Sequence, residues 1–153
     1  MKILVMSDSH GNTNNMLDAV DLESPDVILH IGDHDKDCAD IELMHPEIPI
    51  RSVRGNCDRF SAQLDIDEFT LDGKHFFMTH GHLFGVKTGK TKIVDIAVDR
   101  GVDVLIFGHT HVPYYSITDG VTVINPGSIG AGGKSYAVLD FKNGKLSCEL
   151  KNL

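Results

Sequence analysis

The chain has 153 residues, 41% hydrophobic and 24% charged, which is typical of one soluble domain with its own core. Its formal net charge of -8, from 14 Lys+Arg against 22 Asp+Glu, argues against broad nucleic-acid binding, which needs a basic surface. No apolar run approaches the ~20 residues of a membrane span, so no membrane partner is expected. The three cysteines are far apart, and the N-terminus lacks a signal-peptide pattern. We therefore expect a single domain over residues 1–153 in a reducing, cytoplasmic setting.

The first half of the chain alternates between short apolar runs and amphipathic segments. The apolar runs predict strands at 3–6, 27–31 and 50–54, because a short continuous apolar run suits a strand buried on both faces. Thr13 is the expected N-cap of a helix that carries an apolar face through Val20 and ends before Pro25. A second helix is expected at 37–44. This order is typical of parallel strands joined by helices.

The second half is rich in hairpin turns. Asp72-Gly73, Asp119-Gly120 and Asn143-Gly144 predict hairpins at roughly 66–79, 113–125 and 135–150. Between the first two, an amphipathic helix around Ile93 ends at Gly101 and leads into a strand at 102–107. Two mixed β-sheets packed face to face, with helices outside, accommodate both halves. The predicted fold class is therefore α/β.

Polar side chains follow five of the predicted strands. They are Asp8 and His10, Asp33, Asn56, His80, and His109 and His111. In the near-extended chain expected after Gly108, residues two apart point to one side, so His109 and His111 would present both imidazoles to one space. Ligands of open α/β sheets bind beyond the carboxyl ends of the strands. Mixed imidazole and carboxylate donors suit Zn, Fe, Mn, Co or Ni.

The size of this set indicates how many metals it could hold. Seven ligands are too many for one catalytic metal, which keeps an open position. They suit two metals roughly 3.5–4 Å apart that share one carboxylate. Two divalent cations held by only two aspartates leave a local positive charge, which would let an acidic protein hold a phosphate anion.

Read in order, these motifs resemble those of the calcineurin-like metallophosphoesterase superfamily, and within it the small YfcE-like phosphodiesterases. The motifs are Asp8-Ser9-His10, Gly32-Asp33, Gly55-Asn56-Cys57-Asp58, His80 and Gly108-His109-Thr110-His111. The resemblance implies a four-layer αββα sandwich. It also implies a metal-dependent phosphoesterase, expected to be a phosphodiesterase, in which a hydroxide bridging two metals attacks phosphorus. The expected partner is a small phosphate ester, with a homo-oligomer as an open alternative.

The resemblance also implies a role for each motif residue. Asp8, His10 and His111 would bind the first metal, Asn56, His80 and His109 the second, and Asp33 would bridge them. Two divalent ions are expected per chain: manganese first, with Ni, Zn, Fe or Co as alternatives. Asn56, Cys57 and Asp58 are the expected catalytic group, and His82 the expected substrate-binding residue.

Position 57 departs from the pattern of the superfamily. Much of the superfamily has histidine after the motif asparagine, where it can aid the leaving group; here the residue is Cys57. A thiol is a weak donor with a pKa of ~8.5. Substrates with good leaving groups are therefore expected.

Several of these residues also have simpler interpretations. His30 is expected to be a hydrogen-bonded core histidine, and His82 could lie on the outer rim with no chemical role. Asp58 could orient a neighbouring group or be a simple loop cap. Phe60 could touch substrate or a second subunit, with core packing as the default. The alternative function is a protein-interaction scaffold of the same fold, such as the vacuolar-sorting subunit of retromer. All seven ligand positions are intact, which favours the enzyme.

Overall fold

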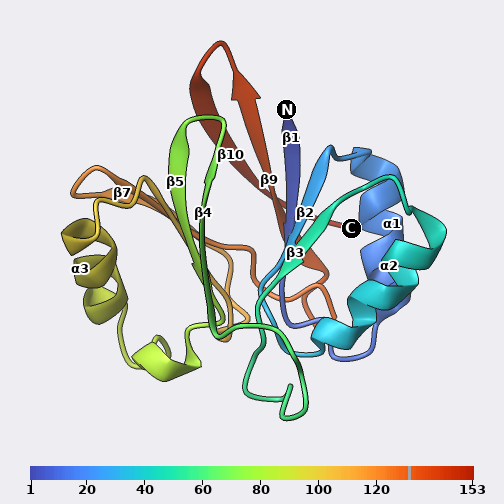
Figure 1. The fold of residues 1–153 in the computed structure, drawn as a ribbon. Helices are drawn as coiled ribbons and strands as arrows, with labels where there is room; N and C mark the ends of the chain where they lie inside the picture. The colour runs from blue at the N-terminus through green and yellow to red at the C-terminus, as the bar shows by residue number, and fades with distance from the viewer. Residues whose placement is uncertain (131) are drawn as a thin grey trace.

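Two five-stranded sheets form the centre of the molecule (Figure 1). They are built from ten strands in residues 1–130 and 132–153, the part of the chain that the computed structural model describes. The first sheet has the order β10-β9-β1-β2-β3, in which β1, β2 and β3 are parallel. Its strands are β1 (Lys2–Met6), β2 (Val27–His30), β3 (Ile50–Ser52), β9 (Ser135–Lys142) and β10 (Lys145–Asn152).

The second sheet has the order β4-β5-β6-β8-β7. Its strands are β4 (Ile66–Leu71), β5 (Lys74–Thr79), β6 (Val104–Phe107), β7 (Tyr114–Thr118) and β8 (Val121–Asn125). The three central strands are parallel, and an antiparallel strand closes each edge. All three predicted hairpins are confirmed, as β4–β5, β7–β8 and β9–β10.

The helices are α1 (Thr13–Glu23), α2 (Cys38–Met44) and α3 (Thr91–Asp99), with short 3₁₀ turns η1 (Asp35–Asp37) and η2 (His82–Phe84). The predicted N-cap of α1 is wrong by one residue. Asn12 is the cap, since its side chain accepts a hydrogen bond from the Asn15 amide at 3.3 Å, and Thr13 is already helical. Asparagine caps a helix at least as well as threonine does. Within the described residues, no helix is both long and apolar enough to cross a membrane.

Three apolar layers hold these elements together. Val5 and Leu29 of the first sheet meet Met78 and Ile106 of the second between the sheets. α1 and α2 cover the outer face of the first sheet, and α3 covers the outer face of the second (Figure 1). The four-layer αββα sandwich is therefore confirmed. Both faces of β1, β2 and β6 are covered, which explains why these strands are continuous apolar runs in the sequence.

The register of the parallel strands places the predicted ligands at one edge of the sandwich. Met6 of β1 lies beside His30 of β2, and Thr79 of β5 lies beside Phe107 of β6. Backbone hydrogen bonds continue just past these strand ends, from the Asp8 amide to the Gly32 carbonyl (2.9 Å) and from Gly108 to His80 (3.1 Å). The loops that follow the four strands therefore lie next to one another.

Candidate metal centre

The loops at this edge have an unusual backbone. Asp8, His10, His109 and His111 have φ angles of 55°, 48°, 67° and 59°, all in the left-handed region that non-glycine residues rarely adopt. The prediction of a near-extended chain from His109 to His111 is therefore wrong. The chain turns at each of these residues, so the two imidazoles face different neighbours. Residues in sparsely populated backbone regions cluster at functional sites, where the surrounding structure holds them.

One group of donor atoms comes from the loops after β1 and β6. Nε2 of His111 lies 3.0 Å from Oδ1 of Asp8 and 3.4 Å from Nε2 of His10. His10 Nε2 is itself 3.9 Å from the same carboxylate oxygen. Asp8, His10 and His111 could thus place three donor atoms around one metal ion.

A second group comes from the loops after β2, β5 and β6. Nε2 of His80 lies 3.4 Å from Oδ2 of Asp33 and 3.2 Å from Nδ1 of His109. The Nδ1 of His80 lies 2.7 Å from the carbonyl oxygen of Ile31, to which it can donate. This contact fixes the ring so that Nε2 faces the other donors, a common arrangement for a ligating histidine. These three side chains could hold a metal ion as well.

The two groups adjoin each other. Oδ2 of Asp33 lies 3.9 Å from Nε2 of His10, so this carboxylate reaches both groups. Oδ1 of Asp8 lies 3.9 Å from Nε2 of His80. Asp33 belongs to one candidate donor set with His80 and His109 and to another with His10. Among the described residues, no other carboxylate belongs to two such sets. This position suits the expected bridging ligand.

One buried atom tests whether cations fit this space. Asp8 is fully buried, and its Oδ2 accepts hydrogen bonds from the Ser7 hydroxyl and, at 3.1 Å, from the His109 amide. Its Oδ1 is buried and accepts no hydrogen bond from any described residue. The nearest polar group is Nε2 of His111, at 3.0 Å. A buried carboxylate oxygen that accepts no hydrogen bond is costly, and a cation bound between it and the imidazoles would remove that cost. The donor set therefore fits divalent metals.

The pKa values at this site follow from burial and neighbouring charges. Burial raises the pKa of Asp33, but hydrogen bonds from His80 and from the Cys57 amide outweigh this effect and bring the pKa below its usual range. Burial and the positive charges of His80 and Lys87 lower the pKa of His109 to about 4. Burial also lowers the pKa of His80, but Asp33 and Asp8 outweigh it, so the net pKa is raised. An ionised carboxylate and a neutral His109 are the forms that bind a metal.

The loop at 55–58 lies beside Asp33. The Cys57 amide donates to Oδ1 of Asp33 at 2.9 Å, and the Cys57 thiol lies within reach of the donor atoms of His10 and Asp33. Asn56 is exposed, and its side-chain amide donates to the Cys57 sulfur at 3.4 Å. Sequence reasoning did not identify Cys57 as a group close enough to contact a bound metal.

Asp58 has both oxygens occupied by backbone groups. Its Oδ1 accepts from the amides of His34 (2.8 Å) and Asp35 (3.2 Å), and its Oδ2 accepts from the amide of Gly55 (2.7 Å). These bonds connect the loop after β2 to the loop after β3. The geometry therefore favours the simpler interpretation, in which Asp58 caps these loops, including the turn that follows Asp33.

Three further histidines surround the two groups. The ring of His82 lies 5.5 Å from that of His80 and 6.2 Å from that of His109, which suits a residue at the substrate mouth. The ring of His34 lies 5.4 Å from that of His10. His30 is fully buried, its Nε2 is 3.3 Å from the Ser9 hydroxyl, and burial lowers its pKa to about 4. His30 is thus a core histidine, as predicted.

A buried aspartate that sequence reasoning missed supports the loop after β1. Asp37 accepts hydrogen bonds from the Ser9 hydroxyl and the Gly11 amide, both at 2.7 Å. These bonds help to hold His10 in its left-handed conformation. Nothing in the local sequence separates Asp37 from an ordinary acidic residue at the start of α2.

Comparisons with known proteins agree with this geometry. Residues 1–144 match the model of the calcineurin-like phosphoesterase superfamily domain. A Bacillus subtilis protein named "Probable metallophosphoesterase YsnB" is 33% identical over 150 residues, covering 94% of this chain and 86% of that protein. A phosphodiesterase of Methanocaldococcus jannaschii is 31% identical over 145 residues, covering 83% of each chain. The structure of Vps29 from Entamoeba histolytica complexed with zinc has a TM-score of 0.78 over 99% of this chain and 98% of its own, at 20% identity, which shows a shared fold alone.

Proposed function

The chain belongs to the calcineurin-like phosphoesterase superfamily, and on that premise we propose that it is a phosphodiesterase that uses two divalent metal ions. The observation that carries this proposal is the meeting of two imidazole–carboxylate groups at Asp33, beside a buried Asp8 oxygen that lacks a hydrogen bond. We further propose that residues 1–153 form one catalytic domain that acts on a small phosphate diester in the cytoplasm, with manganese as the preferred ion.

The proposed ligands follow the two groups. Asp8, His10 and His111 would hold one cation, His80, His109 and Asn56 the other, and Asp33 would contact both. When bound, the two cations would lower the pKa of a water molecule and hold the phosphoryl oxygens of the ester. The charge that they bring also accounts for anion binding by a chain with a net charge of -8.

The protein's own contribution is positioning. The Ile31 carbonyl orients the His80 ring, and the Ser7 hydroxyl and His109 amide hold one oxygen of Asp8 so that the other faces the imidazoles. Asp58 fixes the turn that carries Asp33. Because these contacts exist before substrate binds, little reorganisation is needed at the moment of reaction. The Cys57 thiol, which lies within reach of the donor atoms of His10 and Asp33, would contact the ester or a metal.

A substrate and metal panel tests the proposal. Purified protein, stripped with chelator and reloaded in turn with Mn, Ni, Zn and Mg, would be assayed on bis(4-nitrophenyl) phosphate, 4-nitrophenyl phosphate and cyclic nucleotides. We expect hydrolysis of the diester that depends on added metal, and about two metal ions per chain by mass spectrometry. A scaffold of this fold would show no turnover with any ion, and that result would contradict the proposal.

A further inference from the structure

We infer that the pocket beside Cys57 binds the nucleoside part of a nucleotidyl phosphodiester, with Phe60 stacking on the base and Arg59 holding a further phosphate. This inference rests on the proposed phosphodiesterase activity and names the class of substrate for the same site. It follows from the position of the pocket, from an arginine without a carboxylate partner and from a fully exposed aromatic ring.

The pocket adjoins the candidate metal centre. It has a volume of about 340 Å³ and is lined by residues of η1 and of the loop after β3, among them the cations Lys36 and Arg59, the acids Asp35 and Asp58, and Cys57 and Phe60. Cys57 belongs to this lining and also lies within reach of donor atoms of His10 and Asp33. The His34 ring contacts that of His10. A diester held at the metal centre would therefore extend one of its substituents into this pocket.

Arg59 differs from the other arginines of the chain. Arg51, Arg54 and Arg100 each form an ion pair, with Asp67, Asp65 and Glu68 respectively. Arg59 is exposed and has no carboxylate within ion-pair distance among the described residues, and the same is true of Lys36. The two acids of the pocket bond to other groups: Asp58 accepts from three backbone amides, and Asp35 accepts from the Ser61 hydroxyl. Within the described residues, the charges of Lys36 and Arg59 are therefore left for an anionic ligand. The arginine fork suits a phosphate in particular.

Phe60 supplies the aromatic part of the site. Phe60 is fully exposed, with a relative accessible surface of 102%. The prediction that it packs in the core is therefore wrong. The reason is its place in the loop between β3 and β4: it belongs to none of the three apolar layers. An exposed aromatic ring beside cations is the usual platform for a nucleic-acid base, which stacks on it without sequence preference.

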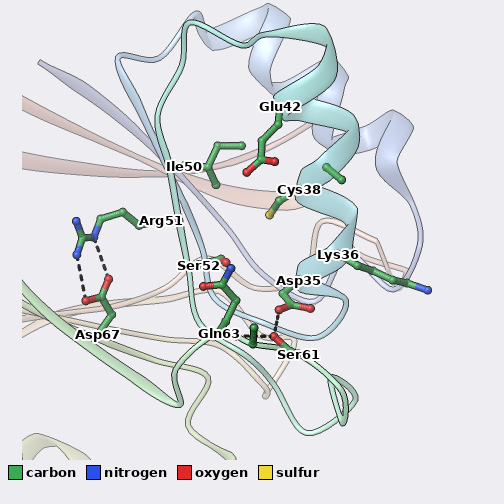
Figure 2. A pocket seen from close by; sticks show the side chains of 12 residues that line it. Asp35, Lys36, Cys38, Glu42, Ile50, Arg51, Ser52, Ser61, Gln63 and Asp67 are labelled. Carbon is green, nitrogen blue, oxygen red and sulfur yellow. Dashed lines mark hydrogen bonds and ion pairs between the residues drawn. The ribbon is translucent and has the colours of Figure 1, made fainter.

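A larger neighbouring cavity does not compete for the same ligand. It has a volume of about 520 Å³ and lies between α2, β3 and the loop that contains Ser61 (Figure 2). Its arginine, Arg51, is bonded to Asp67 at 2.9 Å, so its charge is already paired. Glu42, which lines this cavity and not the smaller one, would repel a phosphate. The hydrogen bond between Ser61 and Asp35, drawn in Figure 2, joins two residues that line both cavities.

The chemistry of the pocket defines the ligand. A diester with an aromatic base and one more phosphate would satisfy the ring and the two cations at once. Hydrolysis would add the oxygen of water to phosphorus and break the bond from phosphorus to one ester oxygen, which leaves as an alcohol. Dinucleotides that carry a 5′-phosphate are the simplest substrates of this kind.

Three matched substrates separate the contribution of base stacking from that of the extra phosphate. They are 5′-phosphorylated dithymidine, dithymidine without that phosphate, and a 5′-phosphorylated abasic dinucleotide. We expect wild type to favour the first over each of the others by about tenfold or more in kcat/KM. Arg59→Ala should remove the preference for the 5′-phosphate, and Phe60→Ala the preference for the bases. Phe60→Tyr, which keeps a ring, should retain the latter.

Two variants control for loss of exposed bulk or charge elsewhere. Leu43→Ala removes a 79% exposed apolar side chain on α2, and Lys145→Ala removes an exposed cation on β10. Both should keep the wild-type preferences, and all variants should keep their metal content. Equal kcat/KM for the three substrates, or preferences unchanged in Arg59→Ala and Phe60→Ala, would overturn the inference.

The inference and the proposed function can fail separately. If bis(4-nitrophenyl) phosphate is hydrolysed but the dinucleotides show no preference, only the inference fails. If no diester is hydrolysed, calorimetry with thymidine 3′,5′-bisphosphate still tests the pocket. Binding weakened about tenfold by Arg59→Ala and by Phe60→Ala would support it. Binding that neither variant changes would refute it.

Discussion

The carboxylate of Asp33 packs directly against the backbone of Gly55. A Cβ atom on residue 55 would lie 2.2 Å from Oδ1 of Asp33 and 2.4 Å from its amide nitrogen, closer than real Cβ contacts occur. The absence of a side chain at position 55 is what lets the two loops approach, and the Cys57 and Asp58 hydrogen bonds depend on that approach.

Gly55→Ala should therefore displace Asp33 and reduce both metal content and diester hydrolysis. The rate of hydrolysis should fall by roughly a hundredfold, because a displacement of about 1 Å at a reacting centre has a cost of that size. Gly89→Ala is the matched control, because a Cβ there meets nothing within 4 Å. Metal analysis and steady-state kinetics on both variants check the prediction. Wild-type metal content and turnover in Gly55→Ala would contradict the tight contact.

Asp33→Asn should lose metal and activity together. Asp33 is the proposed ligand of both cations, and an amide oxygen bridges two cations poorly because it carries no charge. Metal content by mass spectrometry and the rate with bis(4-nitrophenyl) phosphate would be compared with those of Asp95→Asn, an exposed aspartate on α3. If Asp33→Asn retains two metals and near-normal turnover, the bridging assignment is wrong.

His109→Ala and His111→Ala should each weaken a different metal site. The left-handed backbone at both residues sends His109 to Asp33 and His80, and His111 to Asp8 and His10. Crystals of the two variants soaked in manganese, with anomalous scattering recorded, would show which ion each has lost. Loss of the same ion in both variants would rule out the assignment.

Acid should destabilise the metal-free protein partly through His30. Burial lowers the pKa of His30 to about 4, although Asp58 and Asp37 oppose the shift, while the unfolded value is about 6.5. Below pH ~6.5 the unfolded chain binds a proton that the folded chain does not. The contribution of neutral His30 to the free energy of unfolding is therefore fully present above pH ~6.5. It is lost as the pH falls toward ~4, by at most about 3 kcal/mol.

Denaturant unfolding in the presence of chelator, at several pH values between 7 and 4, measures this effect. His30→Gln should flatten the fall in the free energy of unfolding. His75→Gln, a histidine of the β4–β5 hairpin, controls for the removal of a histidine elsewhere. The same pH dependence in wild type and His30→Gln would mean that His30 does not cause the acid sensitivity.

Cys57→His should change how the rate depends on the leaving group. The resemblance to the superfamily suggests that the residue at 57 aids the departing oxygen, and burial and the charge of Asp33 raise the pKa of the Cys57 thiol. Help from a general acid is worth ~10²–10⁴-fold, and only when the departing oxygen is basic. Alkyl diesters should therefore gain rate in the variant, and nitrophenyl esters should gain little.

The measurement is the slope of log rate against leaving-group pKa for wild type and Cys57→His. A flatter slope in the variant, with metal content unchanged, is the expected result. Cys57→Ser serves as a control, because it keeps a small side chain without adding an imidazole. Equal slopes in wild type and Cys57→His would show that position 57 does not contact the leaving group.

The sequence was sufficient to predict the layers and the ligand loops. Asp72-Gly73 and its two counterparts located the hairpins, and the apolar runs located the strands because both faces of those strands are covered. Asp33 and His80 each follow a predicted strand, and ligands of such sheets bind beyond the carboxyl ends of the strands, which predicted that the two residues meet. These features depend on periodicity and turn chemistry, which are local properties of the chain.

The details that failed depend on contacts between distant segments. The turn at His109 is held by the Asp8 carboxylate, about a hundred residues earlier in the chain, and no local pattern encodes that bond. Asn12 rather than Thr13 caps α1, because both residues are competent caps and only geometry decides between them. Core packing was the default for Phe60 because hydrophobicity alone does not reveal that a loop side chain joins none of the apolar layers.

The donor atoms of the metal centre are divided between the two sheets. Asp8, His10 and Asp33 follow strands of the first sheet, and His80, His109 and His111 follow strands of the second. Neither sheet carries both donor groups, so a bound ion would join the first sheet, which holds the N-terminal and C-terminal strands, to the second, which is formed by the middle of the chain. Metal binding and hydrolysis would then require that the two sheets pack in the correct register. A chain whose sheets were misaligned by a single residue would be partly folded but inactive.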